Sequence, residues 1–127
     1  MPTKPRPKYL DLFTLAPKMS ITAKVSILHR ITGFLLFLSI PFVLYVLHKS
    51  LTSPDFYSSF YGVISTPIVK LIYLLFIFVF MYHMCAGVRY LFLDMDKGVE
   101  VHKAKLTAKI VIVVSILLTV ILGAIIW

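Results

Sequence analysis

Four side chains that could do chemistry lie within or beside stretches of sequence that are otherwise apolar. His29 and Arg30 precede one such stretch, His83 lies inside another, and Arg89 closes it. Charged groups and imidazoles are costly at membrane depth, where they usually face protein and serve a function. These positions are therefore candidates for binding a metal, an anion or a proton.

The first cluster has the spacing of one helix face. A helix places its polar or small members at positions i, i+3, i+4 and i+7: Ser26, His29, Arg30 and Gly33. We expect this face to look into protein and the neighbouring aliphatic side chains to turn outward: Ile27, Leu28 and Ile31. On it, Arg30 could bind an anion or a carbonyl oxygen while Ser26 supplies a hydroxyl.

The second cluster centres on His83, which lies about 9 Å along a helix from Arg89. Small and polar residues continue its stripe at i+4, i+7 and i+11: Gly87, Tyr90 and Asp94. A glycine beside a buried histidine leaves room for a flat group. The residues alone leave three interpretations of His83 open, namely a haem ligand, a structural hydrogen bond between helices, and part of a proton or ion pathway.

The elements that must position these residues are membrane helices. The chain has 127 residues, of which 60% are hydrophobic, and a mean hydropathy of +0.96. Three uncharged runs, 31–47, 71–88 and 110–127, approach the roughly 20 residues that a helix needs to cross a bilayer. Their unbroken apolar character predicts an all-α membrane protein rather than a β-barrel, because a backbone in lipid must bond to itself.

We expect a single membrane-anchor domain over residues 1–127, with no room for a soluble catalytic domain. It comprises an N-terminal arm over 1–20 and three helices over about 21–48, 66–94 and 105–127. Ser20 is a plausible cap for the first helix. The connection over about 49–66 is expected to be a short loop.

The cations indicate how the helices are oriented. Of 13 Lys and Arg residues, those on one side of the predicted spans are Lys4, Arg6, Lys8, Lys18, Lys24, Arg30, Arg89, Lys97, Lys103, Lys105 and Lys109. Only Lys49 and Lys70 fall on the other side. This asymmetry predicts that the N-terminus lies inside and the C-terminus outside. Because the cations alternate with the spans, they do not indicate nucleic-acid binding.

Other polar residues have plainer interpretations. Arg89 taken alone is typical of an anchor that reaches from a helix end to lipid headgroups. His48 and His102 are expected to be interfacial and solvated, and Cys85 to behave as a small hydrophobic residue. A single cysteine excludes an intrachain disulfide, a thiolate zinc site and an iron-sulfur cluster held by this chain alone.

Two motifs in register resemble the cytochrome b subunit of succinate dehydrogenase, the quinone-reducing respiratory complex II. The first motif consists of Arg6, Pro7 and Leu12, followed by Ser26, His29, Arg30, Thr32 and Gly33. The second consists of His83, Gly87, Val88, Arg89 and Asp94. The resemblance extends from Arg6 to Trp127 and includes three spans of the same orientation.

The resemblance implies a membrane anchor that carries no succinate chemistry itself. Electrons would pass from a flavoprotein subunit through an iron-sulfur subunit to ubiquinone. His83 would be an axial ligand of haem b, whose other ligand a second hydrophobic anchor subunit supplies. His29 and Arg30 would lie near the haem propionates, and Ser26 and Arg30 would line the quinone pocket. Tyr90 departs from the family pattern, since many relatives have histidine there.

Two rival functions remain: a structural anchor that binds neither haem nor quinone, and a small proton or ion channel subunit. A short chain without a transit segment or a cleavable signal favours a bacterial plasma membrane over a mitochondrial inner membrane.

Overall fold

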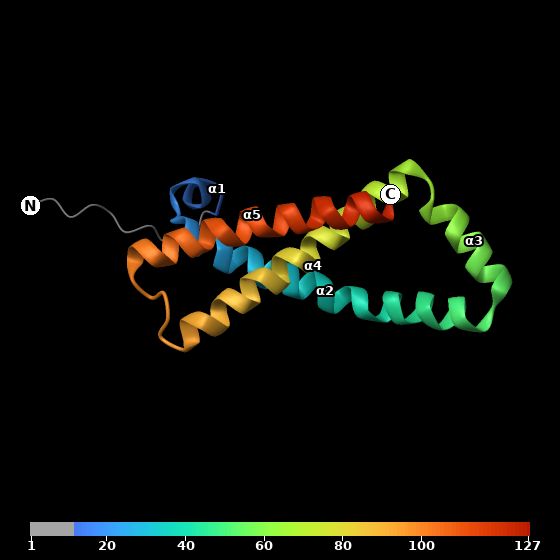
Figure 1. Cartoon of the computed structure of the whole chain (residues 1–127), viewed down its shortest axis with the longest axis horizontal. Coiled ribbons are helices and arrows are strands. Elements are labelled where there is room, and N and C mark those ends of the chain that lie inside the picture. The colour runs from blue at the N-terminus through green and yellow to red at the C-terminus, as the bar shows by residue number, and fades with distance from the viewer. Residues whose placement is uncertain (1–11) are drawn as a thin grey trace, which may run out of the picture.

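The computed structural model describes residues 12–127, and most of the expected arm, residues 1–11, lies outside them. A short helix α1 (Leu12–Leu15) and a 3-10 turn (Ala16–Lys18) precede three long helices (Figure 1). These are α2 (Ile21–Thr52), α4 (Pro67–Asp94) and α5 (Val101–Ile126), and all three are long and apolar enough to cross a membrane. The described residues contain no strand. The chain is therefore a multi-pass α-helical membrane protein.

The start of α2 is set by a side-chain cap. Ser20 has extended backbone dihedrals, and its hydroxyl accepts a hydrogen bond of 3.3 Å from the backbone N–H of Ala23. This bond satisfies one of the donors that a helix leaves unpaired in its first turn. The expectation that Ser20 caps the first helix is confirmed. From there α2 continues without interruption through Pro41.

The connection between the first two long helices differs from the expected short loop. It contains an additional helix, α3 (Pro54–Ile64), which follows directly after the end of α2. The Ser53 hydroxyl accepts from the Phe56 N–H at 3.2 Å, Pro54 occupies the first turn, and Asp55 places a carboxylate near the positive end of the helix dipole. These start signals were present in the sequence, because the serine and proline that are typical of a loop are here the cap and the first turn of a helix.

The three long helices meet through a small core and a stripe of small residues. The core side chains come from α2, α4 and α5: Val25, Tyr82, Ala86, Ala108 and Val111. The buried stripe on α5 repeats every three or four residues: Ala108, Val111, Ser115, Thr119 and Gly123. Small residues let helix backbones approach closely in a membrane, and α5 packs more extensively on α4 than on any other element.

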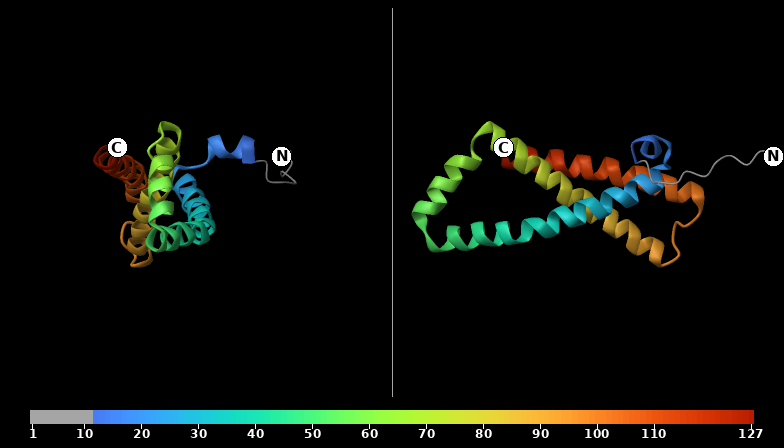
Figure 2. Two further views of the ribbon diagram at one scale, coloured as in Figure 1. Left: turned by 90° about the vertical axis from the view of Figure 1, so that its right-hand side faces the viewer. Right: turned by 180° about the vertical axis from the view of Figure 1, so that it is seen from behind.

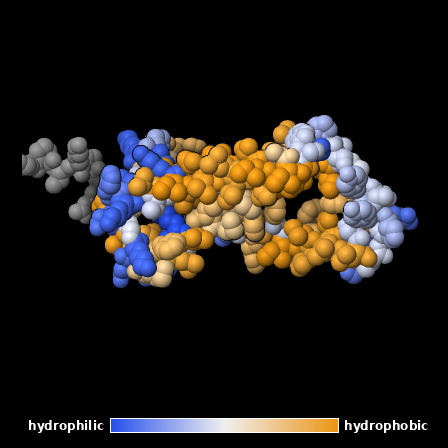
Figure 3. Space-filling view, in the orientation of Figure 1, coloured by the Kyte–Doolittle hydropathy of each residue, from blue (hydrophilic) through white to orange (hydrophobic). Residues whose placement is uncertain are grey.

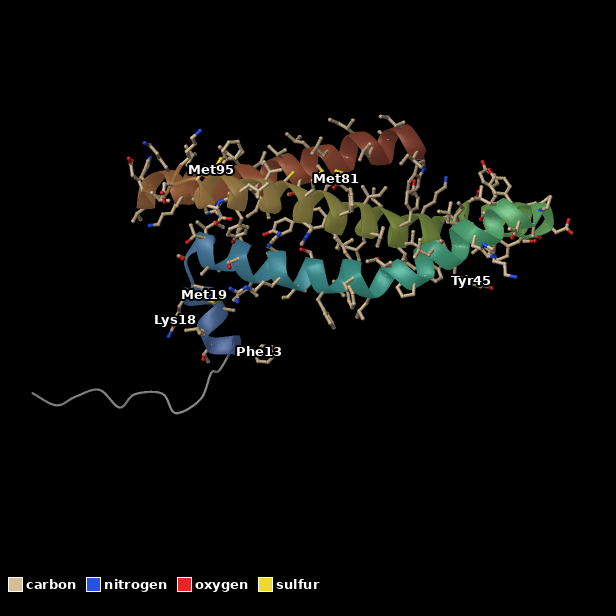
Figure 4. The ribbon with its side chains drawn as sticks, turned by 90° about the horizontal axis from the view of Figure 1, so that it is seen from below. Phe13, Lys18, Met19, Tyr45, Met81 and Met95 are labelled. Atoms are coloured by element: carbon tan, nitrogen blue, oxygen red, sulfur yellow. The ribbon has the colours of Figure 1, made fainter. Side chains whose placement is uncertain are left out.

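The two ends of the bundle are hydrophilic, and a continuous apolar band lies between them (Figure 3). At one end α2 begins, α4 ends and α5 begins, and we name this the basic end for its lysines and arginines. Figure 4 places Met19 and Met95 there and Tyr45 toward the opposite end, near α3. The turn from α4 to α5 uses positive φ angles at Asp96 (56°) and Gly98 (79°), which aspartate and glycine tolerate better than most residues. The turn lies at the basic end and reverses the direction of the chain, as the second view in Figure 2 also shows.

Candidate functional site

The side chain of His83 extends from α4 toward α2, and residues of α2 contact one edge of its ring. Its Nδ1 atom is 3.1 Å from the His29 carbonyl oxygen and 3.2 Å from the Thr32 hydroxyl. The Thr32 hydroxyl can direct its own proton to the Leu28 carbonyl at 2.8 Å, which leaves its oxygen free to accept. A backbone carbonyl can only accept. The contacts therefore assign the proton of the His83 ring to Nδ1.

This tautomer leaves the other ring nitrogen available. Nε2 of His83 carries the lone pair and has no hydrogen-bond partner within residues 12–127. Histidines that ligate metals usually have this arrangement, in which one ring N–H donates to a carbonyl or carboxylate and so fixes the ring and its tautomer. The Thr32 contact was not anticipated from the sequence, although Thr32 belongs to the first motif. Thr32 follows His29 by three residues, and this helical spacing could have indicated that Thr32 lies on the same side of its helix as His29.

The His83 ring also packs closely against two residues of α2. The ring of His29 stacks on it with centroids 4.3 Å apart and planes 9° apart. Gly33 lies against the same ring, and a Cβ atom added there would come within 2.8 Å of the His83 Cε1 atom. At Gly87, an added Cβ would meet His29 Nε2 at an ordinary 3.6 Å. Gly33 is therefore required for the position of His83, whereas Gly87 has some room.

Gly33→Ala and Gly87→Ala are expected to have opposite effects on stability. Alanine improves helix propensity by about 1 kcal/mol at either position. At Gly33 the overlap with His83 must displace the ring or α2, and such overpacking costs about 1–3 kcal/mol. We expect the first variant to unfold at a lower temperature than the wild-type protein in detergent, and the second at an equal or higher temperature. Equal midpoints for the two variants would contradict the close approach at Gly33.

Ser26 and Arg30 differ in exposure within the described chain. Ser26 is half-buried and lines a cavity of about 590 Å3 at the basic end, together with Arg89, Tyr90 and Lys105. Arg30 is exposed and is not part of that cavity. Within this chain the polar face is therefore covered only in part, and whether Arg30 faces protein stays a prediction. The outward exposure of Ile27, Leu28 and Ile31 is confirmed.

Arg89 does not reach outward from its helix end, as its position in the sequence suggested. Its side chain is only 7% exposed. Nε donates to the Thr107 hydroxyl at 3.0 Å, and Nη2 donates to the Ala104 carbonyl at 3.2 Å. The guanidinium therefore turns across to α5 and links the last turns of α4 to the first turns of α5. The partner lies eighteen residues away on another helix, so helix periodicity alone could not identify it.

Thr107→Val should show how much the hydrogen bond between Arg89 and Thr107 contributes to stability. Valine keeps the shape of threonine but removes the acceptor for Arg89 Nε, and a buried donor left unpaired costs about 1–3 kcal/mol. We expect a clearly lower unfolding temperature for Thr107→Val. The matched control is Thr52→Val, which removes a hydroxyl bonded to the His48 carbonyl at an exposed helix end. Equal effects of the two substitutions would show that the Arg89 link contributes nothing.

Two tyrosines complete the surroundings, and sequence reasoning assigned neither a role. Tyr82 is buried, and its hydroxyl donates to the Val25 carbonyl at 3.1 Å, which ties α4 to α2. The Tyr90 ring lies 5.1 Å from the His29 ring and 5.3 Å from the Arg89 guanidinium carbon. The Tyr90 hydroxyl is buried and has no hydrogen-bond partner in the described part of the chain.

The fold and the site define a small three-helix membrane protein with a fixed imidazole between two spans and a cationic end. The chain matches the succinate dehydrogenase/fumarate reductase transmembrane subunit family over residues 2–122. It is 35% identical over 124 residues to the succinate dehydrogenase cytochrome b556 subunit of Coxiella burnetii, covering 96% of this chain and 97% of the relative. The subunit of that name from Rickettsia prowazekii is 35% identical over 105 residues, covering 83% and 82%.

A further relative is the succinate dehydrogenase cytochrome b560 subunit of Reclinomonas americana, which is 34% identical over 110 residues and covers 82% of this chain and 76% of the relative. The chain belongs to the succinate dehydrogenase/fumarate reductase transmembrane subunit family and, within it, to the succinate dehydrogenase cytochrome b subunits. The resemblance inferred from the two motifs is thereby confirmed.

Proposed function

We propose that this chain is a haem b-binding membrane anchor of succinate dehydrogenase and that His83 supplies one axial ligand to the iron. The observation that carries the proposal is the state of the His83 ring, with Nδ1 donating to the His29 carbonyl and Nε2 unpartnered. An iron ligand needs that free lone pair and a fixed ring. The relatives' names, cytochrome b556 and b560, support a haem as the group bound.

The surrounding residues hold His83 in place and offer partners for a haem. Gly33 has no side chain that would displace the His83 ring. His29 is stacked on His83, and exposed Arg30 follows it in the chain, so both can act on the anionic propionates at the rim of a haem. When bound, haem b takes up and releases one electron reversibly. A second hydrophobic anchor subunit would supply the other ligand to the iron, so a bound haem would cross-link the two subunits.

Ser26 and Arg30 form the part of the ubiquinone site that belongs to this chain. Both lie near the start of α2, at the basic end of the apolar band. A quinone carbonyl accepts hydrogen bonds, and a serine hydroxyl and a guanidinium can donate them. Reduction to the quinol also requires two protons, which favours a site near an aqueous face. Arg30 makes no hydrogen bond or ion pair within residues 12–127, so its donors are free for a ligand.

The basic end of the bundle faces the cytoplasm, where the iron-sulfur and flavoprotein subunits dock. This orientation rests on the lysines and arginines that flank the start of α2 and the turn between α4 and α5. The C-terminus then lies outside. Bacterial relatives support the bacterial plasma membrane as the location.

The test is a reduced-minus-oxidised visible spectrum of the complex purified through a tag on this chain, with its other subunits identified by mass spectrometry. We expect a low-spin b-type signal together with a flavoprotein, an iron-sulfur protein and one further hydrophobic subunit. If the same subunits are present without a haem signal, the chain is a structural anchor and the haem proposal is wrong. Conductance by the chain alone in bilayers, without those subunits, would indicate a channel.

A further inference from the structure

The face of α4 opposite His83 carries a groove that the proposed function does not use. The groove lies between α4 and α5, has a volume of about 480 Å3, and is almost entirely apolar. We name it the α4–α5 groove, and its main apolar lining residues are Met84, Val88, Phe92, Ile110, Val111 and Val114. At 100° per residue, Val88 and Phe92 lie roughly 140° and 180° around α4 from His83. If His83 faces the haem and the partner anchor, as proposed above, the groove faces away from both.

Two cations stand at the basic end of this groove. Arg89 and Lys97 both line it, and Arg89 also lines the neighbouring cavity that contains Ser26. Groove and cations together form an apolar slot with a positive mouth at the basic end of the bundle. Lys105 lines the adjoining cavity and adds a third positive charge nearby.

Arg89 is the residue that indicates an anionic ligand. It is more than nine-tenths buried, and its hydrogen-bond partners are a neutral hydroxyl and a neutral carbonyl. The salt bridge within the described residues joins Lys103 to Glu100 and leaves the Arg89 charge uncompensated. A buried charge is normally paired, because leaving water costs several kcal/mol per ion.

Part of the guanidinium remains open to a ligand. Nε and Nη2 are engaged, whereas Nη1 has no partner within residues 12–127. In that part of the chain, the side-chain polar atoms that are buried without a hydrogen-bond partner are the hydroxyls of Tyr73 and Tyr90. Arg89 Nη1 is not one of these buried atoms, so it is accessible from the adjoining cavities. Arginine suits a phosphate oxygen here, since its remaining N–H groups have a fixed direction.

We propose that the α4–α5 groove binds one anionic phospholipid. One acyl chain lies along the apolar lining, and the phosphate lies between Arg89 and Lys97. A lipid fits the groove better than a soluble anion does, because the long apolar slot is continuous with the charged mouth. The negative headgroup supplies the charge that Arg89 lacks, and the bound lipid fastens the end of α4 to the start of α5.

The test uses native mass spectrometry of the intact succinate dehydrogenase complex, extracted from membranes that contain phosphatidylglycerol and phosphatidylethanolamine. Val114→Trp fills the groove, and Val113→Trp is its matched control, because both valines are exposed on α5 but only Val114 lines the groove. We expect Val114→Trp to retain one phosphatidylglycerol fewer than the wild type and Val113→Trp to retain the wild-type number. Equal retention in all three complexes would overturn the proposal.

The charge requirement is tested on the same complex with Lys97→Gln and its control Lys109→Gln, a cation outside the groove. A lysine near the surface contributes about 1 kcal/mol to binding an anionic lipid, so the preference for phosphatidylglycerol should fall about fivefold for Lys97→Gln only. Both variants leave Arg89 and its hydrogen bonds intact. A retained lipid without headgroup preference in the wild type would contradict an anionic ligand. The haem spectrum of each variant separates this result from a failure of the proposed function, since His83 lies on the opposite face.

Discussion

His83→Asn is expected to remove haem b from the complex while leaving the helices of this chain in place. The asparagine side-chain nitrogen occupies nearly the position of histidine Nδ1, so it can still donate to the His29 carbonyl, 3.1 Å from Nδ1 in the wild type. It has no atom equivalent to Nε2. The substitution therefore separates the structural role of the ring from its proposed role as a ligand.

The expected haem content of the purified His83→Asn complex is about a tenth of the wild-type value or less, because losing a metal ligand costs well above the 1.4 kcal/mol that corresponds to tenfold. The pyridine haemochrome assay measures this content per flavin. His102→Asn is the matched control, since His102 is exposed in the first turn of α5. Loss of haem in both variants would indicate general damage, and normal haem in His83→Asn would exclude His83 as a ligand.

The second large effect is expected for Arg30→Ala, which should slow quinone reduction without affecting succinate oxidation. A hydrogen bond from a charged donor contributes about 1.5–3 kcal/mol, which corresponds to about a 10- to 100-fold fall in kcat/KM for ubiquinone. Ser26→Ala removes a neutral donor and should cost about fivefold. Succinate oxidation with an artificial acceptor that takes electrons before the membrane should remain at the wild-type rate in both variants.

Two controls separate binding from charge. Lys24→Ala removes a cation from the same helix one to two turns before Arg30, and it should leave the KM for ubiquinone unchanged. Arg30→Lys keeps the charge but loses the planar fork of donors, so it should restore only part of the activity. Equal loss of activity with ubiquinone and with the artificial acceptor in Arg30→Ala would show that the residue serves assembly of the complex rather than the quinone.

The sequence predicted the class of fold well because the membrane imposes simple rules. Span length, unbroken apolar runs and the Ser20 cap are local features, and each has a direct structural consequence. The helix α3 was missed although Ser53 and Pro54 are local start signals, since serine, proline and aspartate in a row are also typical of turns and loops. Local signals thus predicted the long helices better than the short one.

The site was predicted only in part, because helix periodicity gives a face but not what that face contacts. His83 and His29 were expected on polar stripes of their helices, yet their stacking depends on how α2 and α4 are rotated about their axes. Arg89 shows the limit most clearly. Its sequence context is that of a headgroup anchor, and only the packing of α5 reveals the hydroxyl of Thr107 that draws it inward.

The most direct measurement of the central claim is near-infrared magnetic circular dichroism of the oxidised complex, which reports the axial ligands of a low-spin haem. The wild type should show a pair of ligands that includes the imidazole of His83. In His83→Met, any haem retained should show a thioether in place of that imidazole, and its potential should rise. An unchanged wild-type signal in His83→Met would contradict the assignment of His83 as a haem ligand.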